Sequence, residues 1–319
     1  MHTKLKHHHP HCSPATTQVP SSAETSTLAS VAGQIAGSPT SATAVARTTP
    51  AASVPAKVSD QPSSSGLQSQ PEQPITVACV HNFVPPHINN SSVHTPLHVS
   101  RFELLLRHHP DKEFASYVLN GLRYGFSIGF TASRDVSVQS ANLPSSAACA
   151  SFISDQLYAS CQRGETAGPF SAAPFTSMRC SGVGAVPKKN GKLRMIHHLS
   201  SPAGNSVNDG VPADQFSLHY ISIDDAIESI MSSPQPVYLA KLDIKSAFRQ
   251  IPVRAEDHSL LGIFWQGNYY YERVLPFGLR SSPAIFDSVA SAIEWIIRNH
   301  FSIADLFHYL DDFLNVTTG

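Results

Sequence analysis

Two adjacent aspartates stand in the middle of an apolar stretch. Residues 306–316 place apolar side chains on both sides of Asp311 and Asp312, which predicts a β-hairpin with two acids at its tip. A second apolar run, residues 237–242, predicts a buried strand that ends at Asp243. Neighbouring carboxylates raise each other's proton affinity, and the apolar neighbours offer no obvious cation to relieve the repulsion.

A divalent cation would relieve this repulsion, because carboxylate oxygens are the ligands that Mg²⁺ prefers. If the strand that ends at Asp243 lies beside the hairpin, three carboxylates share one edge of a sheet. Three acids can hold two ions about 3.5–4 Å apart, an arrangement that stabilises the attacking and leaving oxygens of phosphoryl transfer. An isolated Asp-Asp pair is more often a solvated turn, since Asp is a common turn residue. The acids alone leave both alternatives open.

Composition excludes several classes of protein. Charged residues make up 14% of the 319 residues, and 22 basic side chains nearly balance 23 acidic ones, which excludes a polybasic protein that coats DNA. No apolar run reaches the roughly 18 residues of a transmembrane helix, and the N-terminus lacks the apolar segment of a secretory signal. The five cysteines include no Cys-x-x-Cys pair, which predicts reduced thiols in an intracellular protein, cytoplasmic or nuclear and not secreted.

The first part of the chain divides into two predicted regions. Residues 1–75 consist mainly of Ser, Thr, Ala, Pro, Gln and Val without aromatics, which predicts a disordered low-complexity tail. Residues 95–165 predict a small helical leader module. Its first helix covers residues 97–108 with Leu97, Arg101, Leu104 and Leu105 near one face. The second begins after the N-cap Asp111, and the third covers residues 146–163.

Short strands and turns dominate from residue 169 onward. Residues 182–187 and 192–196 flank a turn that contains Asn190-Gly191, a strong hairpin signal. Residues 260–265 and 269–274 predict a second hairpin, and Ser282-Pro283 predicts the start of a long amphipathic helix. The pattern indicates an α+β fold, with an antiparallel sheet backed by helices.

Four segments resemble the motifs of reverse transcriptases, in that family's order. Residues 243–252 (DIKSAFRQIP) resemble the first palm motif, residues 275–286 (LPFGLRSSPAIF) the second and residues 309–312 (YLDD) the third. Residues 186–191 with Arg194 resemble the fingers hairpin, so the likeness covers roughly residues 169–319. Further segments, among them residues 120–126, 196–200 and 206–210, resemble the polyproteins of tyrosine-recombinase (DIRS-like) retroelements.

The resemblance implies a polymerase palm with fingers that acts as an RNA-directed DNA polymerase. The implied partners are an RNA template, a DNA primer and deoxynucleoside triphosphates, without a membrane, and the implied cofactor is a pair of Mg²⁺ ions, with Mn²⁺ as a substitute. Asp243, Asp311 and Asp312 match the catalytic and metal-binding acids, and the backbone carbonyl of Ile244 would complete the metal shell.

The same resemblance implies seven substrate-binding residues. Lys189 and Arg194 match the cations that hold the triphosphate, Phe248 matches the residue under the incoming sugar, and its neighbour Ala247 is also implied to bind substrate. A bulky ring at Phe248 would exclude a 2′-hydroxyl. The other three matches, in the loop of the second motif and beside the primer terminus, are Phe277, Gly278 and Tyr309.

The chain departs from the family pattern after the YLDD segment. The thumb and RNase H regions have no counterpart here, so we expect a truncated chain that is weakly active or inactive alone. RNase H and recombinase domains are expected in the full-length element. The alternative is a decayed or co-opted palm remnant that binds nucleic acid or a protein partner without catalysis. A third alternative, an RNA-templated RNA polymerase, is disfavoured by Phe248.

Overall fold

The computed structural model describes residues 49–50, 95–218, 220–301 and 303–318. The helices are α2 (Val99–Leu106), α3 (Lys112–Tyr124), α4 (Ser145–Ala148), α5 (Ala150–Gln162), α6 (Ile223–Ser232) and α7 (Ser282–Phe301), with short 3-10 turns η1 (Asn208–Gly210), η2 (Asp214–Phe216), η3 (Ala247–Gln250) and η4 (Ala255–Leu260). The strands are β1 (Thr49–Pro50), β2 (Val138–Gln139), β3 (Thr166–Phe170), β4 (Arg179–Cys180), β5 (Val183–Pro187), β6 (Leu193–His197), β7 (Val237–Asp243), β8 (Gly262–Trp265), β9 (Asn268–Glu272), β10 (Leu306–Tyr309) and β11 (Asp312–Thr318). The α+β prediction is confirmed. None of the helices in these ranges is long and apolar enough to cross a membrane.

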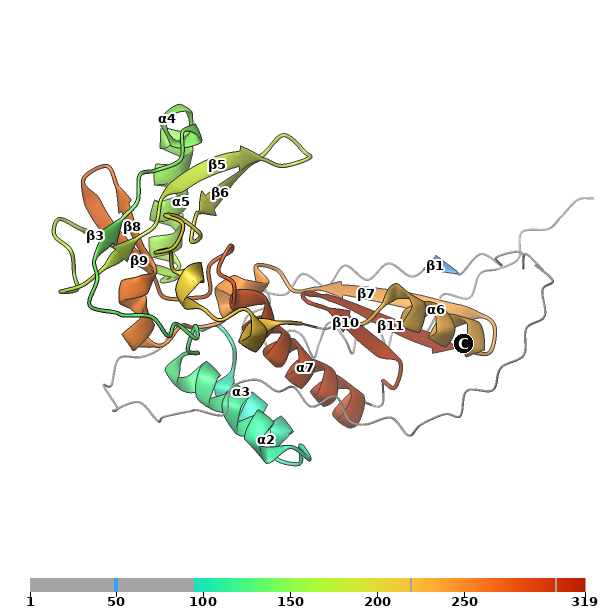
Figure 1. Cartoon of the computed structure of the whole chain (residues 1–319). Coiled ribbons are helices and arrows are strands. Elements are labelled where there is room, and N and C mark those ends of the chain that lie inside the picture. Colours follow the sequence, from blue (N-terminus) through green and yellow to red (C-terminus); the bar gives the residue numbers. More distant parts are fainter. Residues whose placement is uncertain (1–48, 51–94, 219, 302, 319) are drawn as a thin grey trace, which may run out of the picture.

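One antiparallel sheet, which we call the C-terminal sheet, has the strand order β1-β7-β11-β10. Its inner strands alternate buried and exposed side chains, because one face packs on helices. In Figure 1, α7 runs beside β10 and β11. Of the predicted disordered tail, the described part is Thr49–Pro50, which pairs with β7, and the remainder lies outside the described residues.

The other end of the molecule is built from a five-stranded sheet, β2-β4-β8-β9-β3, and the β5–β6 hairpin (Figure 1). Both predicted hairpins are confirmed. The β8–β9 turn places Gln266 and Gly267 at positive φ, as a tight two-residue turn requires. Helix α5 covers these strands through a small core that comprises Ile153, Leu157, Val183, Ile263 and Trp265.

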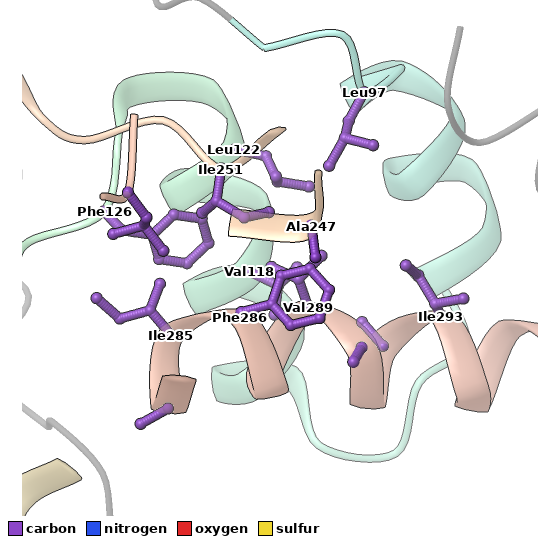
Figure 2. Packing of buried hydrophobic residues seen from close by; sticks show 14 of the residues in the cluster. Leu97, Val118, Leu122, Phe126, Ala247, Ile251, Ile285, Phe286, Val289 and Ile293 are labelled. Atoms are coloured by element: carbon purple, nitrogen blue, oxygen red, sulfur yellow. The ribbon is translucent and has the colours of Figure 1, made fainter. Parts of the chain in front are cut away.

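The main core surrounds α7. Figure 2 shows side chains from α3, η3 and the α7 helix meeting in one apolar cluster, with Phe286 and Val289 of α7 near Ala247 and Val118. Helices α2 and α3 thus pack on α7, whereas α5 packs on the five-stranded sheet. The longer helices of residues 95–165, α2, α3 and α5, therefore divide between two cores.

The predicted apolar face of the first helix was partly wrong. The structure buries Phe102 and Leu106, while Leu104 is 47% exposed and Arg101 is exposed. Apolar residues occupy positions on several sides of this helix, so docking against α3 and α7 selected the buried face. The predicted N-cap of α3 is confirmed, since the carboxylate of Asp111 accepts a hydrogen bond from the Phe114 amide at 2.8 Å.

Candidate active site

Strand pairing brings the three acids together at one end of the C-terminal sheet. Asp312 on β11 is the direct partner of Asp243 on β7 and also pairs with Tyr309 on β10. Leu310 and Asp311 form the turn between β10 and β11, and Leu310 takes the left-handed conformation with φ of 54°. The Ile244 amide donates to the carbonyl oxygen of Asp311 at 2.9 Å, which fixes the end of β7 against the turn. The predicted adjacency of the three acids is therefore present.

A lysine accompanies these acids, contrary to the sequence-based expectation of no nearby cation. The Nζ atom of Lys241 lies 2.9 Å from Oδ2 of Asp312. Lys241 and Asp243 are two residues apart on β7, so their side chains emerge on the same face. That face is the more exposed one, which explains why an apolar-looking strand carries a lysine there.

The pKa of Asp243 responds to its surroundings. Burial, followed by the charges of Asp311 and Asp312, raises the pKa of Asp243, and Lys241 opposes this rise. The hydrogen bond to Asp312 raises the pKa of Lys241. Three carboxylates with one ammonium leave an excess of negative charge at this end of the sheet.

This excess charge and the hard oxygen donors fit a divalent cation. In the described part of the chain, however, no three His, Cys, Asp or Glu side chains are gathered as a metal-binding cluster. Lys241 holds one oxygen of Asp312, so a metal ion would compete with its ammonium. The metal roles of the three acids and of the Ile244 carbonyl stay predictions.

Phe248, five residues after Asp243, forms an aromatic surface together with Phe277. Phe248 on η3 is half-buried, and its ring centroid lies 5.0 Å from that of Phe277 and 5.6 Å from that of the core residue Phe286. Phe277 is 53% exposed, whereas Ala247 is buried beneath. The structure therefore gathers three of the predicted sugar-binding and loop residues, with one ring open to solvent.

The loop that carries Phe277 depends on a glycine and on a buried amide. Gly278 has φ of 92°, and a Cβ atom there would lie 3.1 Å from the carbonyl oxygen of His197. Asn208 donates from Nδ2 to the Gly278 carbonyl at 2.9 Å and accepts from the Arg280 amide at 2.8 Å. Sequence reasoning gave Asn208 no role, because nothing local marks an amide that bridges segments seventy residues apart.

The aromatic Tyr309 also has a partner that sequence reasoning missed. Its ring centroid lies 4.6 Å from that of Tyr220, and the two side chains are 52% and 40% exposed. Tyr220 comes from the loop before α6, so the pair joins two separate segments beside the acids.

The two predicted triphosphate-binding cations lie on the β5–β6 hairpin. Lys189 is in its turn and Arg194 is on β6, and both are exposed. Within the described ranges, no hydrogen bond or ion pair joins either of them to the three acids. The hairpin itself is anchored by the amide of Ala185, which donates to Ser145 of α4 at 3.1 Å.

Comparison with known proteins shows what the part of the chain that carries these motifs is similar to. Residues 186–319 match the family model described as "Reverse transcriptase (RNA-dependent DNA polymerase)". The chain is 26% identical over 148 residues to the Gag-Pro-Pol polyprotein of Sheep pulmonary adenomatosis virus, covering 44% of this chain and 8% of the relative. It is 31% identical over 137 residues to the Gag-Pro-Pol polyprotein of Human T-cell leukemia virus 3 (strain 2026ND), covering 40% of this chain and 9% of the relative. The chain thus spans less than a tenth of these relatives.

Solved structures give weaker matches. The native protease-reverse transcriptase of Prototype Foamy Virus is 22% identical with a TM-score of 0.43, covering 60% of this chain and 23% of that one. The foamy viral protease-reverse transcriptase dRH in complex with double-stranded DNA is 17% identical with a TM-score of 0.40, covering 74% and 41%. The reverse transcriptase family model matches residues 186–319, less than half of this chain.

Proposed function

We propose that this reverse transcriptase domain is the fingers and palm of an RNA-directed DNA polymerase, covering residues 169–319. It would extend a DNA primer on an RNA template with deoxynucleoside triphosphates. The observation that carries the proposal is the direct pairing of Asp243 with Asp312, with Asp311 in the adjoining turn. The family match over residues 186–319 supports it independently.

In this proposal the acids hold two Mg²⁺ ions, with Mn²⁺ as a substitute. Asp243, Asp311, Asp312 and the Ile244 carbonyl are the proposed ligands. When bound, such ions lower the pKa of an attacking hydroxyl and neutralise the leaving pyrophosphate. The excess negative charge of the acids supports this assignment, and a metal ion on Asp312 would compete with the ammonium of Lys241 for one carboxylate oxygen.

The remaining residues bind and orient the nucleotide. Phe248 and Phe277 form the aromatic surface on which the sugar packs, and the Phe248 ring excludes a 2′-hydroxyl. Lys189 and Arg194 bind the triphosphate, as a point charge and a bidentate donor respectively. Tyr309 lies beside the primer terminus in this arrangement.

Several finer assignments belong to the same proposal. The resemblance of residues 196–200 and 206–210 supports an origin in a DIRS-like retroelement. In such an element RNase H and recombinase domains would act with this one, and the site of action would be intracellular, in the cytoplasm or nucleus.

A second candidate function is a palm remnant that binds nucleic acid or protein without catalysis. The Lys241–Asp312 ion pair favours it, because the ammonium occupies an oxygen that a metal ion would need. The two candidates differ in whether a divalent cation displaces Lys241.

Primer extension on an RNA template with Mg²⁺ tests the proposal. Asp311→Asn and Asp312→Asn should each abolish extension, because each removes a proposed metal ligand. Asp305→Asn, an exposed acid in the loop before β10, is the matched control and should extend like the unchanged chain. Calorimetric titration with Mn²⁺ gives a second measurement. If the 319-residue chain showed neither primer extension nor Mn²⁺ binding that depends on the acids, the remnant would be favoured.

A further inference from the structure

A partly buried group of charged side chains joins α7 to β10. His308 of β10 lies between two carboxylates of α7: its Nε2 atom is 3.4 Å from Oδ1 of Asp287, and its Nδ1 atom contacts Oε2 of Glu294. Asp287 and Glu294 are seven residues apart, which is two helical turns, so both lie on the side of α7 that faces β10. The His308 side chain is only 12% exposed.

These contacts favour one protonation state of His308. A neutral imidazole has one N–H donor, whereas the imidazolium has two. Both ring nitrogens of His308 lie near carboxylate oxygens, which accept hydrogen bonds when ionised, so the arrangement favours the imidazolium. Burial alone would lower the pKa of His308, but the hydrogen bonds to Asp287 and Glu294 outweigh it and raise the pKa to about 9.

A second contact reinforces the first. Arg298 of α7 donates from Nε to Oε1 of Glu294 at 2.9 Å, and its Nη2 donates to the carbonyl oxygen of Leu306. The His308 ring also stacks on Phe313 of β11, with centroids 5.4 Å apart. Helix α7 therefore contacts β10 directly, and the His308 ring in turn contacts β11 of the hairpin that carries Asp311 and Asp312.

The groups around His308 come from three elements, of which α7 supplies the charged side chains. Asp287, Glu294 and Arg298 lie on α7, and Phe313 of β11 contributes an uncharged ring. Tyr220 belongs to the loop before α6. Burial raises the pKa of Tyr220, and the nearby charge of Asp287 raises it further.

We propose that His308 is a positioning residue, whose imidazolium between Asp287 and Glu294 holds the Tyr309–Asp312 turn in a fixed place relative to α7. Because α7 begins immediately after the Phe277–Gly278 loop, the same contact sets the distance between that loop and the acids. The catalytic part of this inference rests on the proposed polymerase function, whereas the structural part does not.

Hydrogen exchange tests the structural part on the 319-residue chain. His308→Gln should raise the exchange rate of the β10 and β11 amides about tenfold at pH 7, since it removes one charged donor from the contact. Asp287→Asn, which keeps the shape of the side chain, should act in the same direction. His108→Gln, an exposed histidine at the end of α2, is the matched control. Unchanged exchange in both His308→Gln and Asp287→Asn would overturn the proposal.

The pH profile of primer extension tests the catalytic part. Loss of one carboxylate in Asp287→Asn or Glu294→Gln should lower the pKa of His308, and should therefore move the alkaline fall in kcat to lower pH by about one unit. The KM for deoxynucleotide should change less than kcat, because His308 does not touch substrate. A profile identical to that of the unchanged chain would overturn the positioning role. If the unchanged chain showed no extension, the polymerase proposal would fail while the exchange measurement still decided the contact with α7.

Discussion

Lys241 and Asp312 form an ion pair across β7 and β11, with 2.9 Å between Nζ and Oδ2. The pair lies at the end of the sheet where Asp243 and Asp311 also stand, and both of its side chains are partly exposed. An ammonium in this place competes with any cation that the acids bind.

Removal of that ammonium should therefore strengthen binding of divalent cations. Lys241→Gln leaves three carboxylates without a compensating charge, and we expect its Mn²⁺ affinity to rise severalfold in calorimetric titration. Lys112→Gln, whose lysine on α3 hydrogen-bonds to the carbonyl of Arg107, is the control. Weaker Mn²⁺ binding by Lys241→Gln would contradict competition between the two cations.

Arg249 should be a principal contributor to stability. Its guanidinium lies 2.8 Å from Oε2 of Glu272 and 3.3 Å from Oε2 of Glu165, and all three side chains are largely buried. Arg249→Met leaves two buried carboxylates without this partner, and should lower the free energy of unfolding by about 3–5 kcal/mol. Urea denaturation measures the loss.

The double variant Arg249→Met/Glu272→Gln separates charge from packing. It should recover part of the loss, because one of the stranded charges is gone. A loss below about 1 kcal/mol in Arg249→Met alone would show that the buried ion pairs contribute little.

The stability contributed by His308 should decline at alkaline pH. The folded protein raises the pKa of His308 to about 9, above the value of roughly 6.5 for an unfolded chain. The contribution is therefore complete below about pH 6.5 and is lost as the pH rises through 9. The free energies of unfolding of the unchanged chain and His308→Gln should differ by roughly 3 kcal/mol at pH 6 and should converge by about pH 10. A constant difference across this range would contradict the protonation assignment.

Gly278 should tolerate no side chain. Gly278→Ala would place a Cβ atom 3.1 Å from the His197 carbonyl at a φ of 92°, and should cost about 1–3 kcal/mol of stability. The strain should also displace Phe277 and raise the KM for deoxynucleotide. Gly204→Ala is a matched control, since Gly204 has φ of 78° with no atom within 4 Å of an added Cβ. Equal effects in the two variants would assign the cost to backbone strain alone.

Phe248 should select deoxynucleotides. Phe248→Ala removes the ring that packs on Phe277 and should raise ribonucleotide incorporation relative to deoxynucleotide incorporation by at least about tenfold. Competitive primer extension with both nucleotide types measures the ratio. Phe264→Ala, at an aromatic pair on β8 and β9 away from the acids, supplies the control. An unchanged ratio in Phe248→Ala would show that the Phe248 ring serves packing and does not select the nucleotide.

Features set by neighbouring residues were predicted from the sequence. The N-cap at Asp111, the hairpin around Asn190-Gly191 and the acidic tip at Asp311–Asp312 each depend on interactions within a few residues. The sequence predicted that Asp243 lies beside the tip only if its strand pairs with the hairpin, because composition and periodicity do not say which strands pair.

Tertiary structure alone decided the remaining relationships. The buried face of α2, the placement of Lys241 against Asp312, the amide bridge of Asn208 and the position of His308 between two carboxylates all join segments that the chain order separates. Each depends on the angle and register at which whole elements pack, and these are set by the sum of many long-range contacts. The amino-acid order therefore determined which chemical groups the molecule carries and its local turns, whereas packing determined which of those groups meet and in what protonation state.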